Sequence, residues 1–246
     1  MTEAVPFADN LAYLKAELAW LDRVLMRAIA KQRECQREVN RVARTPADRA
    51  TAHWWQGFIN LDPHQGGRRR EEVPAALPHP LGRFGDRLAA SQAAGVALYL
   101  PALTQRLNLS AFERNVVVLG LALESSRRYE KLYDLLNNDG SNRPQPTVDT
   151  ALRLFCRNER EWLVARTSLL PNAPLLKRKI LTTLPGGAGT QLAACLVLQP
   201  KWANFLLHGQ PSLAKLLPKR SRSKAEVVPL TVAAATDGGS QIVQAG

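Results

Sequence analysis

The chain has 246 residues, long enough to bury a core in one large domain or two smaller ones. Lys and Arg number 33 against 21 Asp and Glu, and this net charge of +12 favours acidic partners such as nucleic acid, anionic lipid or an acidic protein face. The three cysteines are odd in number and widely spaced, which argues against a disulfide framework and a paired-thiolate metal site.

The first segment is predicted to be a helix that runs from Phe7 to about Arg44 and ends before Thr45-Pro46. Its apolar residues recur at steps of four and three: Phe7, Leu11, Leu14, Leu18, Leu21, Leu25 and Ile29. This seam lasts about three heptads, so it fits both a coiled-coil dimer and a helix packed on its own domain, and we favour the second. Beyond it, Arg33, Arg37 and Arg41 align on one side, where a solvated face explains them at least as well as a binding stripe.

Residues 62–80, DPHQGGRRREEVPAALPHP, are predicted to form a linker because they are rich in Pro, Gly and alternating charge. The linker separates an N-terminal helical segment, 1–61, from a domain that spans 81–217. Helical patterning resumes at Leu81 and continues to about Asn108, and Pro101 should force a break or restart inside it.

The most regular stretch is LSAFERNVVVLGLALESSRRYEKLYDLLNND, residues 109–139. Ser110 and Glu113 have the spacing of a capping box, which predicts a helix start. The following VVVLGLAL is apolar on every side and predicts a buried helix from about Ala111 to Glu124, with a buried strand as the alternative. A shorter amphipathic helix follows, with Tyr129, Leu132, Tyr133 and Leu136 on its apolar face.

The remaining segments predict shorter elements. Thr147 is placed to cap a helix with Val148, Ala151, Leu152 and Phe155 on its apolar face. A further helix is expected from about Glu159 to Leu170, a strand from about Ile180 to Leu184, and a helix from Trp202 to His208, whereas the type of 191–198 stays open. Residues 218–246 are basic and then rich in small residues, which predicts a disordered tail.

Catalytic signals are weak throughout the chain. LPGGAGTQL, residues 184–192, has glycines and Thr190 but lacks the lysine of a phosphate-binding loop, so we expect an interhelix or hairpin loop. No histidine has metal-ligand spacing, and no serine or cysteine lies in a recognisable nucleophile motif, so we expect no catalytic, cofactor or metal site. Candidate nucleic-acid contacts are the cations of the tail: Lys219, Arg220, Arg222 and Lys224.

The stretch LNLSAFERNVVVLGLALESSRRYEKLYDLLNND, followed by RPQPTVDTALRLFC and LLPNAPLLKRKIL, resembles the N-terminal region of bacterial AAA family ATPases, including those associated with contractile injection systems. The resemblance extends over about 10–209 and implies a variant winged-helix domain. The implied fold is mainly α, a multi-helix domain with a winged-helix-like core, a long N-terminal helix and a small β-wing from 180–184 and 193–198. Where the family has an acidic ELDPRYE, this chain has ESSRRYE, so Ser126 replaces a carboxylate near the helix end.

The resemblance also implies a function. The nucleotide-binding module of that family has no counterpart in this sequence, so ATP and Mg²⁺ are implied only for the missing module and the chain alone should not hydrolyse ATP. We expect a non-catalytic domain that docks a protein partner or substrate onto a separate AAA ATPase module, with Arg127, Arg128, Tyr129 and Arg143 as candidate contacts. The alternative is a basic winged-helix module that binds nucleic acid. No signal peptide begins the sequence and no apolar run approaches the roughly 20 residues that span a bilayer, so we expect a cytoplasmic protein.

Overall fold

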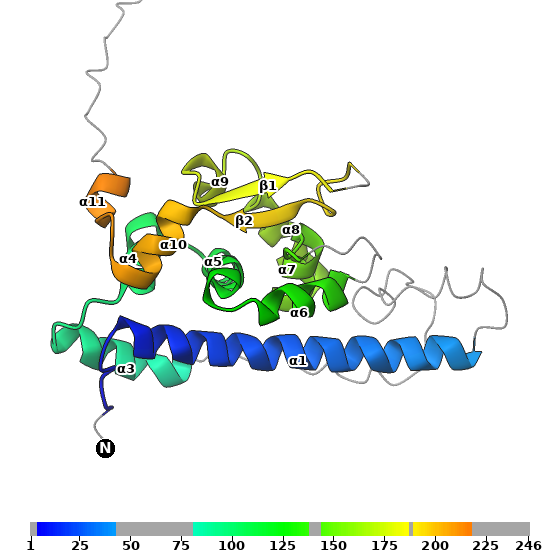
Figure 1. The fold of residues 1–246 in the computed structure, drawn as a ribbon, viewed down its shortest axis with the longest axis horizontal. Helices are drawn as coiled ribbons and strands as arrows, with labels where there is room; N and C mark the ends of the chain where they lie inside the picture. Colours follow the sequence, from blue (N-terminus) through cyan, green and yellow to red (C-terminus); the bar gives the residue numbers. More distant parts are fainter. Residues whose placement is uncertain (1–3, 43–80, 138–143, 187–188, 218–246) are drawn as a thin grey trace, which may run out of the picture.

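The computed structural model describes residues 4–42, 81–137, 144–186 and 189–217, and it is mostly helical with one small two-stranded sheet (Figure 1). This confirms the predicted fold class. The linker at 62–80 and the tail at 218–246 lie outside the described residues. The elements in chain order are α1 Asn10–Val42, α3 Leu81–Ala93, α4 Tyr99–Leu107, α5 Ala111–Ser125, α6 Arg128–Asn137, α7 Val148–Phe155, α8 Glu159–Thr167, α9 Pro174–Lys177, β1 Leu181–Leu184, β2 Cys195–Leu198, α10 Pro200–His208 and α11 Leu213–Leu216.

Helix α1 packs against α5, α6 and α7 of its own chain, which confirms the favoured intramolecular interpretation. The helix begins later than predicted, because Asp9 accepts a hydrogen bond from the backbone N–H of Ala12 at 2.6 Å and caps the first turn. Phe7 therefore precedes the helix, and its ring packs edge-on against Tyr13. Leu11 was predicted on the buried face but is 53% exposed, so the prediction was wrong at this position.

The buried stripe of α1 is rotated relative to the predicted seam. Leu14, Leu21, Leu25 and Ile29 are buried as predicted. The buried positions that a count of leucines omits include Tyr13, Glu17 and Trp20. Two large aromatic side chains bury more apolar area than Leu11 and Leu18 would, and this difference rotates the helix toward them.

Helices α3 and α4 are separated as predicted, although the break lies before Pro101. Helix α3 ends at Ala93, and Gly95 adopts a positive φ of 72° in the turn that follows. Helix α4 then begins at Tyr99, which places Pro101 in the first turn, where a backbone N–H has no helical acceptor. Proline is therefore compatible with the start of α4 and does not interrupt it.

Helix α5 is the central helix of the fold. The predicted capping box is confirmed, because Ser110 Oγ accepts from Glu113 N at 3.2 Å and Glu113 Oε2 accepts from Ser110 N at 2.9 Å. The segment is helical from Ala111 to Ser125, so the alternative of a buried strand is wrong, and every residue from 113 to 122 is buried. The helix contacts α1, α6, α7 and β2 and thus touches both outer layers of the molecule.

The two strands form an antiparallel hairpin in which Leu181 pairs with Leu198 and Leu184 with Cys195. The stretch predicted as a loop at 184–192 connects these strands, which confirms the hairpin alternative. Gly186 is required there, because an added Cβ would lie 2.1 Å from the carbonyl oxygen of Ala193. At the base of the hairpin, Gly120 of α5 would place a Cβ 3.0 Å from Leu198 Cβ, so glycine allows β2 to pack closely on the helix.

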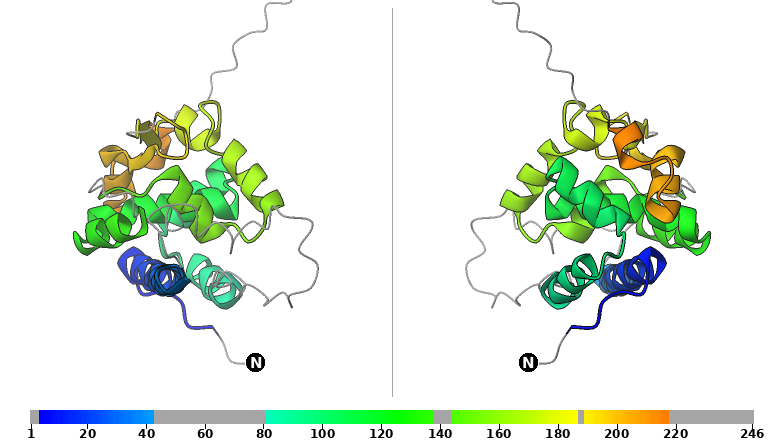
Figure 2. Two further views of the ribbon diagram at one scale, coloured as in Figure 1. Left: turned by 90° about the vertical axis from the view of Figure 1, so that its right-hand side faces the viewer. Right: turned by 90° about the vertical axis from the view of Figure 1, so that its left-hand side faces the viewer.

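The described elements form three layers. Helices α1 and α3 lie side by side in the first, α5, α6 and α7 lie above them, and the hairpin covers the far side (Figures 1 and 2). One hydrophobic cluster includes side chains from α1 through α10, so α1 and the 81–217 region share a core. The predicted division at 62–80 falls outside the described residues and stays a prediction. Among the described helices, none is long and apolar enough to cross a membrane.

Candidate docking surface on helix α8

Helices α7 and α8 form a helix-turn-helix unit that local capping holds in place. The predicted cap of α7 is confirmed, because Thr147 Oγ1 accepts from Thr150 N at 3.1 Å. After the short turn, Asn158 Oδ1 accepts from Glu161 N at 2.9 Å and begins α8. Glu161 Oε2 in turn accepts from Arg157 N at 2.9 Å, so the side chains of Asn158 and Glu161 link the first turn of α8 to the turn before it.

The outer side of α8 carries exposed apolar side chains. Leu163 is 54% exposed and Val164 is 63% exposed. Leu170, in the turn that ends the helix seven residues after Leu163, is 44% exposed. Ala165 instead faces the core, and Trp162 is half-buried with the Arg166 guanidinium 5.2 Å from its ring centroid. We call the three exposed residues, Leu163, Val164 and Leu170, the α8 apolar surface.

The charge around the α8 apolar surface is balanced. Helix α8 carries two acidic residues, Glu159 and Glu161, and two basic ones, Arg160 and Arg166. Neither strand of the neighbouring hairpin, LTTL and CLVL, contains a charged residue. Three exposed cations, Lys177, Arg178 and Lys179, precede β1. The second helix of the helix-turn-helix therefore offers apolar area without the excess of cations that phosphate binding needs.

A comparison with protein-family models gives a match to the variant winged helix domain over residues 1–219. The chain belongs to this family. The order of a buried helix α5, the helix-turn-helix α7 and α8, and the hairpin β1 and β2 accords with that assignment, and the two predicted wing strands are confirmed. An isolated bridge between Thr147 and Cys195 adds a third short segment to the hairpin of this winged helix domain. Searches of the curated proteins and of the solved structures found no match.

The residues predicted as partner contacts differ in exposure within the winged helix domain. The Arg127 side chain is 91% exposed and lies 3.5 Å from Glu130. Arg128 is bound to Asp22 of α1 and lies over the Tyr129 ring. Tyr129 was expected on the surface but is 1% exposed, because its ring belongs to the core and its hydroxyl donates to Asp22 at 2.7 Å. Tyr129 can therefore hold Asp22 and Arg128 in place but cannot itself contact a partner.

Arg143 lies outside the described residues, and so do Lys219, Arg220, Arg222 and Lys224. Their roles in partner or nucleic-acid binding stay predictions. Sequence reasoning missed the α8 apolar surface, although one signal was present: four consecutive apolar residues, 162–165, cannot all face the core from one helix.

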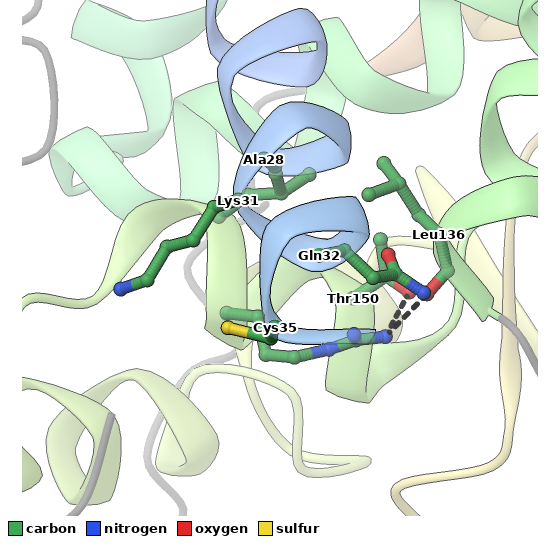
Figure 3. A pocket seen from close by; sticks show the side chains of 8 residues that line it. Ala28, Lys31, Gln32, Cys35, Leu136 and Thr150 are labelled. Carbon is green, nitrogen blue, oxygen red and sulfur yellow. Dashed lines mark hydrogen bonds between the residues drawn. The ribbon is translucent and has the colours of Figure 1, made fainter. Parts of the chain in front are cut away.

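A small cavity lies between α1, α6 and α7 of the winged helix domain (Figure 3). Its volume is about 50 Å³, and it is lined by Ala28, Lys31, Gln32, Cys35, Leu136, Thr150, Arg153 and Leu154. Arg153 donates to Thr150 Oγ1 at 3.1 Å and to the Leu136 carbonyl at 3.0 Å along its wall. Sites for drug-sized ligands and cofactors occupy about 300–1,000 Å³, so this cavity has room for water and not for a nucleotide.

Within the described ranges, no three His, Cys, Asp or Glu side chains come together as metal ligands. Two of the described carboxylates near the core are engaged with cations. Asp149 holds Arg153 at 2.8 Å within α7, and Glu17 holds Arg114 across α1 and α5. The α8 apolar surface is therefore the exposed feature of the described chain that we consider further.

Proposed function

We propose that this winged helix domain is a protein-docking module that brings a partner or substrate protein to an AAA family ATPase. The observation that carries the proposal is the α8 apolar surface, which occupies the second helix of the helix-turn-helix and has balanced charge around it. Burying a Leu or Val side chain completely contributes about 1.5–3 kcal/mol, so two half-exposed side chains offer a protein partner a useful apolar anchor. A nucleic-acid backbone would gain little from them.

The association with an AAA ATPase is supported by the resemblance of 107–139, 143–156 and 169–181 to the N-terminal regions of such ATPases. The ATPase module would belong to the same polypeptide, as in the ATPases associated with contractile injection systems, or to a separate one. The winged helix domain would supply binding, and the ATPase module would supply ATP, Mg²⁺ and mechanical work.

We also propose that the described region performs no catalysis by itself. Its glycine-rich loop lacks a lysine, and Gly186 packs against the backbone of Ala193 inside the hairpin connection. Such a loop cannot wrap a phosphate and supply an ammonium group to it at the same time. Isothermal titration of the purified chain with MgATP should give no heat of binding, and measurable binding would contradict this part of the proposal.

Affinity purification from the cells that produce the chain tests the docking function. A tagged wild-type chain should retain an AAA family ATPase or its substrate, identified by mass spectrometry, and Leu163→Glu/Val164→Glu should lose that protein. The control is Leu11→Glu/Leu135→Glu, which adds the same charge at leucines that are 53% and 48% exposed on α1 and α6. An unchanged set of partners in the α8 variant would contradict the proposal.

A second candidate function is nucleic-acid binding, which the exposed run Lys177, Arg178 and Lys179 beside the hairpin favours. This function predicts binding to duplex DNA that weakens by orders of magnitude between about 50 mM and 200 mM salt. Lys177→Glu/Lys179→Glu should then abolish DNA binding, whereas Leu163→Glu/Val164→Glu should affect it little. An absence of DNA binding at the lower salt concentration would remove this candidate.

A further inference from the structure

Helix α1 has a long side that no other described helix covers completely. Its 33 residues extend about 50 Å at 1.5 Å per residue. Helices α5, α6 and α7 cover its buried stripe, whereas α3 lies beside only its N-terminal end (Figures 1 and 2). Beyond α3, the side opposite the core is exposed, and we call it the outer face of α1. Its residues are Ala19, Arg23, Met26, Arg27, Ala30, Arg33 and Arg37.

The outer face of α1 is strongly basic. Arg23, Arg27, Arg33 and Arg37 are all exposed, and within the described ranges none of the four makes an ion pair. The nearby Asp22 is already bound to Arg128 of α6. Glu34 is the exposed acid that interrupts this run of cations in the described part of α1. A partner that brings carboxylates to this face would pair with cations that the described residues leave unpaired.

The spacing along the outer face matches a helical partner. Ala19, Arg23, Met26, Ala30, Arg33 and Arg37 follow one another at steps of four and three. This is the spacing of a coiled-coil seam, although arginines occupy three of its six positions, and their long side chains can extend out of the seam toward carboxylates that flank it on a partner helix. Met26 is 57% exposed and supplies an adaptable apolar contact, while Ala19 and Ala30 allow a second helix to approach closely. Arg27 lies beside the seam, where coiled coils form interhelical ion pairs.

We propose that the outer face of α1 binds an acidic amphipathic helix of a partner protein. A second copy of this chain fits poorly, because two such faces would bring arginines against arginines. Nucleic acid would pair with the arginines but would make no use of Met26 and the alanines between them. The inference deepens the proposed docking function, on which it rests, by giving the partner a helix with carboxylates on both sides of an apolar seam.

The test uses the full chain and a synthetic acidic peptide of about four heptads, with Leu at the two seam positions and Glu at the flanking positions. A peptide with Lys in place of each Glu is the charge control, and a duplex DNA is the nucleic-acid control. Binding is measured by fluorescence anisotropy at about 50 mM and 200 mM salt. The acidic peptide should bind, more weakly at the higher salt concentration, and the basic peptide should not.

Two variants locate the binding face. Arg23→Glu/Arg27→Glu/Arg33→Glu should weaken peptide binding at least about tenfold, because three ion pairs would be lost and three like-charge contacts would replace them. Arg106→Glu/Lys177→Glu/Lys201→Glu is the matched control, since it reverses three exposed cations elsewhere and should change binding less than about threefold. Met26→Glu keeps all the arginines and should also weaken binding, and it decides the question if circular dichroism shows that the triple variant is unfolded.

Several results would overturn this inference. These are no binding of the acidic peptide, equal losses in the triple variant and its matched control, or full binding by Met26→Glu. Tighter binding of the DNA, lost in the same triple variant, would assign the face to nucleic acid instead. Leu163→Glu/Val164→Glu should leave peptide binding unchanged, so a failure here is distinguishable from a failure of docking through α8.

Discussion

Arg114 of α5 and Glu17 of α1 form an ion pair in the interior, with side chains that are 5% and 1% exposed. Arg114 also donates to the Tyr13 hydroxyl at 2.8 Å, so two residues of α1 meet one guanidinium of the central helix. Buried charges are costly unless they are paired, and this arrangement therefore fixes one position of α1 along α5.

Removing one partner of this pair should destabilise the fold strongly. Glu17→Ala leaves a buried guanidinium without its carboxylate, and we expect a loss of about 3–5 kcal/mol in the free energy of unfolding, measured by urea denaturation. Glu17→Met/Arg114→Met replaces both charges with apolar side chains and should recover much of that loss. A double variant no more stable than Glu17→Ala would contradict this expectation, because it would show that the ion pair stabilises the fold more than the two apolar side chains that replace it.

Two glycines should respond oppositely to substitution. Gly120→Val should lower the free energy of unfolding by about 1–3 kcal/mol or more, because the new side chain would overlap Leu198 of β2. Gly85 is exposed in α3 with no atom within 4 Å of an added Cβ, so Gly85→Ala should raise stability by up to about 1 kcal/mol. Thermal unfolding of both variants measures this, and a stable Gly120→Val protein would mean that the hairpin can move away from α5.

The buried thiol of Cys156 should make stability depend on alkaline pH. Burial raises the pKa of this thiol to about 12, with a smaller contribution from the Glu161 carboxylate. The unfolded thiol ionises near pH 8.5, so the folded protein keeps a proton that the unfolded chain loses. The resulting stabilisation is complete below about pH 8.5 and is lost as pH rises toward 12.

Urea denaturation across that alkaline range measures the effect. Tyr13, Tyr129 and Tyr133 also have pKa values raised by burial and add to the same decline. Cys156→Ala should therefore show a shallower fall than the wild type, and Cys35→Ala, which removes a half-buried thiol, is the control. Equal slopes in wild type and Cys156→Ala would show that the thiol ionises alike in the folded and unfolded chain.

The sequence predicted best those features that neighbouring residues determine. The caps at Ser110 and Thr147 depend on a side chain and a backbone N–H three residues away, so spacing alone was sufficient. The buried character of α5 followed from eight consecutive apolar or small residues, 116–123. The hairpin loop was predicted because its glycines came without the lysine that a phosphate site requires.

Features that depend on distant partners were missed. Glu17 interrupts the apolar period of α1, and the reason for its burial, Arg114, lies 97 residues further along the chain. Leu11 has the spacing of a core residue but is exposed, because the contacts of α1 with α5, α6 and α7 determine which of its faces is buried. Tyr129 was predicted both on the apolar face of its helix and as a partner contact, and its burial against the core and Asp22 of α1 agrees with the first prediction only.

The most direct test of the central claim is the affinity of the purified chain for the protein that co-purifies with it, compared between wild type and Leu163→Glu/Val164→Glu. Each anchor that loses apolar contact should cost about 1–2 kcal/mol, so we predict that the double variant binds at least tenfold more weakly. Leu11→Glu/Leu135→Glu should bind like the wild type. Equal affinity of the α8 variant and the wild type would contradict docking through the α8 apolar surface.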